Sequence, residues 1–124
     1  MSTPPFLIID HVQLAMPADG EDIARRFFVE LIGMTETPKP SELAKRGGCW
    51  FRSGKVEVHL GVEQDFRPAL KAHLALVCEN YDALIAKLKL ANVPVKEDFE
   101  IPGTRRSHIA DPFGNRIELI AKTA

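Results

Sequence analysis

The 124-residue chain has few cysteines, no long apolar run and almost no net charge. Its two cysteines, Cys49 and Cys78, are too few for a disulfide framework and form no CxxC metal motif. No apolar stretch approaches the roughly 20 residues of a membrane span. The first ten residues lack the basic start and the cleavage site of a signal peptide. We therefore expect a cytoplasmic protein whose thiols are reduced.

The charge balance argues against a polyanionic partner. Sixteen Lys and Arg against 17 Asp and Glu give a net charge of −1, which provides no basic field for nucleic acid. The expected partner is a small-molecule substrate, and neither nucleic acid nor a membrane is expected. At 45% hydrophobic residues, residues 1–124 are long and apolar enough for a single domain with its own core.

An internal repeat relates the two halves of the chain. His11 opens the run HVQLAM and His73, 62 residues later, opens HLALVC. Near the end of each half, VEVHL places His59 where NRIEL places Glu118, 59 residues later. Histidine and carboxylate side chains are metal ligands. The repeat therefore predicts one site built by two modules about a pseudo-twofold axis.

Module one, about residues 6–63, reads as βαβββ. Alternating apolar positions indicate strands and apolar positions at helical spacing indicate a helix. The predicted elements are a strand over Phe6–Met16, a helix over 21–32 closed by Gly33, an edge strand over Thr35–Pro40, a helical turn in 41–48 capped by Ser41, and a hairpin of 49–52 and 55–63 around Ser53-Gly54.

Module two, about residues 70–122, repeats this order. Its predicted elements are a strand over 72–79, a helix capped by Asn80 with Leu84, Ile85, Leu88 and Ala91 on its apolar stripe, and strands over Pro94–Ile101, 104–110 and 116–122, the last two joined by the tight turn DPFGN. The predicted class is α+β, with two βαβββ modules whose curved mixed sheets surround a cavity.

Strand parity places the polar residues on the faces that the helices leave uncovered. His11 and Gln13 share one face of the first strand, and His59 lies on the corresponding face of its own strand. In module two, the same reasoning puts His108 and Arg106 on one face, and Glu118 on the uncovered face of the last strand. Three His and one Glu at repeat-related positions favour a metal site over isolated pocket histidines.

The motifs IDHVQLAM, WFRSGKVEVHLGV, KAHLALVCENYDAL and DPFGNRIELI carry a family resemblance. Over about residues 7–122 the chain resembles the vicinal oxygen chelate superfamily, which includes glyoxalase I, fosfomycin-resistance thiol transferases, bleomycin-resistance proteins, methylmalonyl-CoA epimerase and extradiol dioxygenases. Because this scaffold hosts several chemistries and some metal-free binders, the resemblance is specific for fold and less so for reaction.

The resemblance implies roles for individual residues. His11, His73 and Glu118 match the family's metal ligands, and His59 stands where glyoxalase I-like members place a fourth ligand, commonly Glu. The residues expected to contact substrate are Gln13, Trp50, Arg106 and His108. In isomerising members the carboxylate at the position of Glu118 also acts as the catalytic base, which needs a pKa nearer the operating pH.

Two hypotheses follow. In the first, the protein is a lyase, isomerase or thiol transferase that uses Zn²⁺, Ni²⁺, Co²⁺, Mn²⁺ or Fe²⁺, with or without a thiol co-substrate, on a small oxygen-chelating substrate. In the second, it is a metal-free small-molecule or drug-binding protein like the bleomycin-resistance members. Family members usually complete their sites by dimerising or by pairing modules, so a homodimer is expected in either case.

Overall fold

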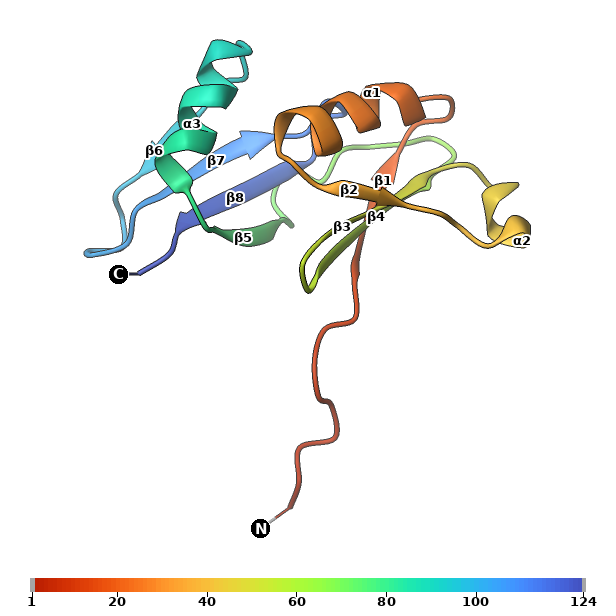
Figure 1. Cartoon of the computed structure of the whole chain (residues 1–124), viewed down its shortest axis with the longest axis horizontal. Coiled ribbons are helices and arrows are strands. Elements are labelled where there is room, and N and C mark those ends of the chain that lie inside the picture. Colours follow the sequence, from red (N-terminus) through yellow and green to blue (C-terminus); the bar gives the residue numbers. More distant parts are fainter. Residues whose placement is uncertain (1, 124) are drawn as a thin grey trace.

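The computed structural model describes residues 2–123, which fold into two four-stranded sheets lying side by side (Figure 1). The first sheet contains, in spatial order, β1 (Val12–Met16), β4 (Val56–Val62), β3 (Cys49–Ser53) and β2 (Thr35–Thr37). The second contains β5 (Leu74–Cys78), β8 (Arg116–Ala121), β7 (Arg106–Ala110) and β6 (Lys96–Asp98). The α+β class and the repeated module are thus confirmed.

The strand registers of the two halves correspond residue by residue. In the first sheet, His59 of β4 lies between Gln13 of β1 and Trp50 of β3. In the second, Glu118 of β8 lies between Ala75 of β5 and His108 of β7. In both halves the first strand, β1 or β5, runs parallel to its neighbour, β4 or β8. The other two strand pairs of each sheet are antiparallel. The repeat seen in the sequence is therefore a repeat of position in the sheet.

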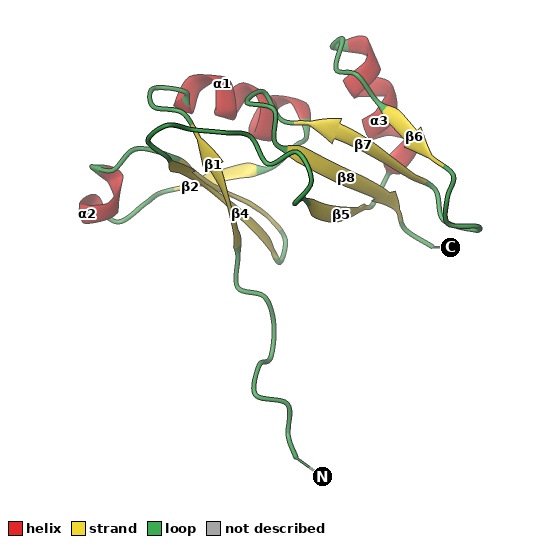
Figure 2. Ribbon diagram, turned by 180° about the vertical axis from the view of Figure 1, so that it is seen from behind, coloured by secondary structure: helices red, strands yellow, loops and turns green. Residues whose placement is uncertain are grey.

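The helices cover one face of the two sheets (Figures 1 and 2). They are α1 (Glu21–Arg25) with the π-helix η1 (Arg26–Leu31) in the first half, and α3 (Tyr81–Leu90) in the second, while α2 (Ser41–Ala44) lies in a loop. Below them, Phe28 stacks on Phe51 with ring centroids 5.1 Å apart, and both side chains are buried. No helix formed by residues 2–123 has the length and apolar content to cross a membrane.

The first helix is not regular throughout its length. Residues 26–31 form a π-helix, and the amide of Ile32 donates to the carbonyl of Phe27, five residues back. The helix ends at Gly33 (φ 81°), where the amide of Met34 donates to the carbonyl of Phe28. The predicted cap at Gly33 is confirmed. The spacing of apolar residues in the sequence did not indicate the π-helix.

Asn80 caps α3 as predicted, accepting a hydrogen bond from the amide of Ala83 at 3.3 Å. The prediction for Ser41 is wrong, because Ser41 begins α2 and Pro40 precedes it without a side-chain cap. The two predicted edge strands are shorter than expected, since only Thr35–Thr37 and Lys96–Asp98 pair with a neighbour.

The predicted strand over Phe6–Met16 begins only at Val12. Its neighbour β4 starts at Val56, after the turn at Gly54, and Val12 already pairs with Val58. Among residues 2–123 no strand pairs with residues 6–10, which extend away from the body (Figure 1).

Asn115 joins the two halves. Its side-chain amide donates to the carbonyl of Ala15 in β1 (2.8 Å) and to Asp111 (2.9 Å), and its side-chain oxygen accepts from the amide of Ala69 (2.9 Å). Asp111 in turn accepts from the amides of Phe113 and Asn115, which closes the DPFGN turn. One buried side chain therefore ties a turn of the second half to the first strand and to the connector.

Candidate functional site

The first half of the candidate site is a stack of three rings. His59 lies between His11, with ring centroids 4.1 Å apart, and Trp50, with centroids 4.2 Å apart and planes 8° from parallel. The His59 side chain is 7% exposed, and its Nε2 lies 3.6 Å from a carboxylate oxygen of Glu57. Cross-strand pairing of β3 and β4 brings Trp50 beside His59, and the residue preceding β1 supplies His11.

Burial is the main cause that lowers the pKa of His59, and the neighbouring His11 lowers it further, although Glu57 opposes both. The ring is therefore kept neutral at physiological pH, which is the form that a metal ion needs. The Nδ1 of His11 lies 2.9 Å from Asp10. Because a carboxylate only accepts, this contact in the neutral ring places the proton on Nδ1 and leaves Nε2 with a free lone pair.

This lowered pKa predicts a pH dependence in the metal-free protein. Below the ordinary pKa of 6.5 the unfolded chain binds a proton at His59 that the folded chain resists, so the free energy of unfolding should fall as the pH is lowered. His59→Phe keeps a flat ring between His11 and Trp50 but cannot titrate. Urea unfolding between pH 6.5 and about pH 5 should give a shallower fall for the variant, and equal slopes would contradict the expectation.

The second half of the candidate site is centred on Glu118, which is buried in β8. One carboxylate oxygen lies 3.0 Å from the Nε2 of His73, and the other accepts from the guanidinium of Arg106 at 3.0 Å. His73 stands just before β5, and β5 pairs with β8, so the strand order itself brings the imidazole to the carboxylate.

A neutral His73 ring cannot make both of the hydrogen bonds that its position suggests. Its Nδ1 lies 2.9 Å from the carbonyl oxygen of Lys71, and its Nε2 lies 3.0 Å from Glu118. Both partners only accept hydrogen bonds, and a neutral imidazole has only one N–H to donate. The pair is satisfied by a doubly protonated ring or by a cation bound to both Nε2 and the carboxylate. The donor set thus fits a divalent metal ion.

The pKa of Glu118 differs from the expectation for a catalytic base. Burial raises this pKa, but hydrogen bonds from Arg106 and His73 together outweigh burial, so the pKa lies below its ordinary value. The pKa nearer the operating pH that a catalytic base needs is therefore not reached by Glu118 in one chain. A carboxylate that stays ionised is suited to holding a cation.

The charged network continues to the edge of the second sheet. Asp98 accepts from His108 at 2.9 Å and lies 2.9 Å from Arg106, and Arg116 approaches the His108 ring at 3.3 Å. The pKa of Asp98 is lowered by the amide of Glu100 and then by His108. The sequence analysis did not identify Asp98 as a site residue. Asp98 lies in β6 directly opposite Arg106 of β7, and this pairing of the two strands would have pointed to it.

The four predicted ligands form two pairs rather than one cluster. Among residues 2–123 no three His, Cys, Asp or Glu side chains lie together as a metal ion requires. A cavity of about 740 Å³ lies between the halves, and His11, Gln13 and His73 line it. The side-chain amide of Gln13 lies over Gly61, and a Cβ atom added to Gly61 would lie 2.6 Å from its nitrogen. A single chain therefore offers two separate half-sites, His11 with His59 and His73 with Glu118.

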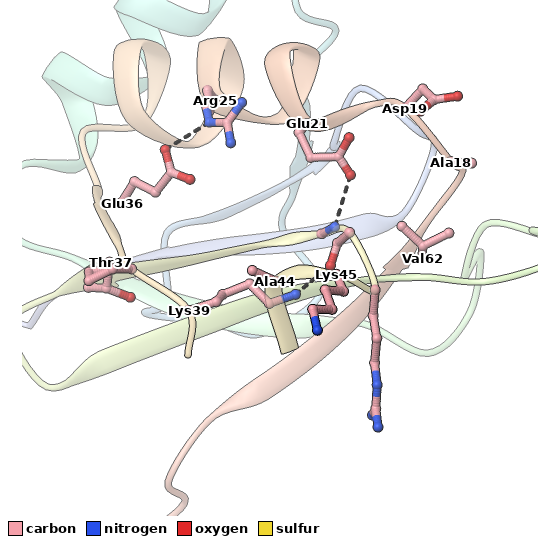
Figure 3. A pocket seen from close by; sticks show the side chains of 14 residues that line it. Ala18, Asp19, Glu21, Arg25, Glu36, Thr37, Lys39, Ala44, Lys45 and Val62 are labelled. Atoms are coloured by element: carbon pink, nitrogen blue, oxygen red, sulfur yellow. Dashed lines mark hydrogen bonds and ion pairs between the residues drawn. The ribbon is translucent and has the colours of Figure 1, made fainter. Parts of the chain in front are cut away.

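A second cavity, of about 810 Å³, contains none of these residues (Figure 3). In this cavity Glu21 accepts from the amide of Gly48 at 2.9 Å, Arg25 donates to Glu36 at 2.8 Å, and Lys39 donates to the carbonyl of Gly47. Most of its charged groups are thus paired within the protein, which leaves the half-sites as the candidate for function.

Solved structures share this architecture. A protein from Bacillus anthracis described as belonging to the glyoxalase family is 45% identical, with a TM-score of 0.94 over 98% of this chain and 100% of its own. TnmS3, an antibiotic binding protein from Streptomyces sp. CB03234, is 24% identical (TM-score 0.68, covering 95% and 100%). Lactoylglutathione lyase from Agrobacterium tumefaciens is 20% identical (TM-score 0.69, covering 96% of each). The last two show the fold alone.

No curated protein matches the chain. The family model for the Glyoxalase/Bleomycin resistance protein/Dioxygenase superfamily matches residues 8–119, which include both half-sites and all of the strands except the last two residues of β8. With the repeated βαβββ module and the corresponding strand registers, this match shows that the chain belongs to the Glyoxalase/Bleomycin resistance protein/Dioxygenase superfamily.

Proposed function

We propose that the protein is a divalent-metal-dependent enzyme of the glyoxalase type, a lyase, isomerase or thiol transferase acting on a small substrate with two neighbouring oxygens. The observation that carries the proposal is the geometry of His73, whose Nε2 lies 3.0 Å from a carboxylate oxygen of Glu118 while its Nδ1 lies 2.9 Å from the carbonyl oxygen of Lys71, so that a neutral ring cannot donate to both. A bound divalent ion would act there as a Lewis acid on the substrate oxygens.

The proposed site takes its ligands from two copies of the chain. His11 and His59 of one copy would meet the partner's His73 and the partner's Glu118, because one chain alone separates the two pairs. Arg106 holds the second oxygen of Glu118, which fixes the direction in which the first oxygen points. We also propose a cytoplasmic location, where the free Cys49 and Cys78 stay reduced.

The substrate would lie along the rows that flank the ligands. Gln13 and Trp50 border His59 in the first sheet, and His108 and Arg106 lie in β7 beside Glu118. Arg106 is a fixed cation that suits an anionic or oxyanionic substrate group. Activity assays on 2-oxoaldehydes and epoxides with and without glutathione would separate the lyase and thiol transferase activities from an isomerase.

Metal binding gives the direct test. After removal of metal by a chelator, wild type should bind Zn²⁺ or Ni²⁺ in calorimetry, and His73→Ala should weaken binding at least about a hundredfold, since even outer-sphere partners of a ligand change affinity about 10–100-fold. Glu118→Gln should act similarly, whereas the matched control Glu79→Gln, at an exposed carboxylate, should not. Equal binding by wild type and His73→Ala would refute the metal site.

One observation favours the second candidate function, metal-free binding of a flat ligand. The stack of Trp50, His59 and His11 ends at His11, which lines the cavity between the halves. Aromatic faces bind planar drugs through offset stacking. Thermal stabilisation by an aromatic drug that is unchanged by chelator and by Glu118→Gln would favour the binding protein over the enzyme.

A further inference from the structure

Arg116, the first residue of β8, is a half-buried cation whose charge no carboxylate of the described residues balances. Arg106, in the same charged network, lies 3.0 Å from Glu118 and 2.9 Å from Asp98. Arg106 is thus shared between two carboxylates, whereas Arg116 faces only the ring of His108. A shielded cation without a counter-charge attracts an anion more strongly than a cation that is already paired.

The contact with His108 holds Arg116 without using its hydrogen-bond donors. One terminal nitrogen of Arg116 lies 3.3 Å from Nδ1 and 3.4 Å from Nε2 of His108. At nearly equal distances from both ring nitrogens, it faces the ring itself rather than one lone pair, as guanidinium groups do when they stack on rings. The ring is held in turn by Asp98, which accepts from Nε2 at 2.9 Å. The guanidinium is therefore fixed in place while its N–H groups stay available to a ligand.

The surface next to Arg116 has room for a small ligand. Ala110 is its partner across the pairing of β7 with β8, and Ala75 is the partner of Glu118 across the pairing of β5 with β8. Both alanines are exposed, and paired residues point to the same side of a sheet. Ala75 and His73 also line the cavity of about 740 Å³ between the halves. The face that carries Arg116 is therefore flanked by short side chains on both sides of β8.

Arg116 stands one step along this face from the proposed metal ligands. Arg116 and Glu118 are two residues apart in β8, so their side chains point to the same side and their Cα atoms are about 6.6 Å apart. His73 directly precedes Leu74, and Leu74 pairs with Ile117, which places His73 beside Arg116. A small molecule bound by a metal ion at His73 and Glu118 would thus lie within reach of the guanidinium.

The charges on this face favour a negatively charged ligand. Two arginines and two carboxylates share it, namely Arg106, Arg116, Asp98 and Glu118. Glu100, 4.0 Å from Arg106, is 87% exposed, so water and salt screen its charge. A divalent ion bound at Glu118 would become the largest local charge and leave the face positive. Arg116 is the protein's part of that excess that has no partner.

We propose that Arg116 binds a carboxylate of the substrate, and that it selects substrates whose carboxylate is separate from the two oxygens held by the metal. The inference rests on the proposed function, since the metal site determines where those two oxygens lie. A guanidinium matches a carboxylate through two parallel N–H···O bonds, which fix the orientation of the ligand as well as binding it. Arg116 is thus a specificity-determining residue, and His108 and Asp98 are its positioning residues.

Malate and its 4-amide test the choice of ligand. Both offer a hydroxyl and the C1 carboxylate to the metal, but only malate carries a second carboxylate. In Zn²⁺-loaded wild type, calorimetry should show malate binding at least about tenfold more tightly than the amide, as a hydrogen bond between charged groups allows. Arg116→Gln should remove this preference and leave binding of the amide unchanged. An equal preference in wild type and Arg116→Gln would overturn the inference.

Arg105→Gln is the matched control, because Arg105 pairs with Asp82 and should have no part in the preference. Arg116→Lys keeps the charge without the planar fork and should retain only part of the preference. His108→Phe keeps a ring against Arg116 and should retain most of it, whereas His108→Ala should reduce it several-fold. A full preference in His108→Ala would refute the positioning role of the ring. Urea unfolding of each variant shows whether it is folded.

NMR of the arginine Nε–H groups separates this inference from the proposed function. Malate should shift the Arg116 signal, which is identified by its loss in Arg116→Gln, and the shift should saturate at lower malate concentration when Zn²⁺ is bound. If wild type binds no Zn²⁺ and malate still shifts this signal, the metal-dependent enzyme fails and the Arg116 site stands. If Zn²⁺ binds and malate leaves the signal unmoved, only the Arg116 inference fails.

Discussion

Replacing Gly48 with alanine is expected to lower the free energy of unfolding by about 4 kcal/mol, from backbone strain and overpacking together. Gly48 has a φ of +84°, and a Cβ atom built on it would lie 2.1 Å from the carbonyl oxygen of Leu60. Leu60 is buried in β4 and pairs with Cys49, the residue after Gly48. The carbonyl therefore cannot move aside without breaking the ladder that carries His59.

Gly54→Ala is the matched control. Gly54 also has a positive φ, +58°, but no atom lies within 4 Å of an added Cβ. Only the strain of the left-handed conformation remains, which costs about 1 kcal/mol. Urea unfolding of the two variants at one pH measures the difference, and equal losses would show that the close approach to Leu60 is relieved cheaply.

Replacing Asn115 with alanine should have an effect of similar size, about 4 kcal/mol, because it leaves buried groups without partners. The variant loses the bonds to the carbonyl of Ala15, the amide of Ala69 and the carboxylate of Asp111. Burial already raises the pKa of Asp111 against the hydrogen bonds that lower it. Removing the amide should therefore raise that pKa further.

Chemical unfolding of Asn115→Ala beside Gln64→Ala, an exposed polar residue in the connector, measures the loss. Asn115→Asp adds a finer test, since it keeps the oxygen that accepts from Ala69 but removes the donor to Ala15. We expect it to lose at least as much stability as Asn115→Ala at neutral pH, because the new carboxylate oxygen would face the carboxylate of Asp111 and the carbonyl of Ala15 in a buried site. A loss below about 1 kcal/mol for Asn115→Ala would mean that water replaces the lost bonds.

Strand parity and the repeat were sufficient to predict much of the site. Val58 and Leu60 are buried under the helix, as their alternation with His59 predicted. The same reasoning placed Glu118 and His108 on one uncovered face, where their register confirms that they are neighbours. Local pattern suffices there, because the side-chain period of a strand fixes the face on which each residue lies.

What local pattern cannot supply is the distance between sheets. The repeat predicted that His11 and His73 converge, yet a single chain keeps the ligand pairs apart. Alternation also extended the first strand to Phe6, because an apolar segment does not reveal whether a neighbouring strand is there to pair with it. The pKa of Glu118 likewise depends on Arg106, whose contact is set by the pairing of β7 with β8.

The π-helix has a consequence for how the two halves diverged after duplication. The spacing from His11 to His59 exceeds that from His73 to Glu118, so the first half has more residues between its ligand positions than the second. A π-turn accommodates an added residue inside a helix, and η1 occurs in the first half, where α3 of the second half is a regular helix. The difference in length lies in part in the helix. The cross-strand rows through the ligand positions correspond in the two halves, with His59 between Gln13 and Trp50 and Glu118 between Ala75 and His108. Helix length and ligand identity can therefore evolve separately in this fold.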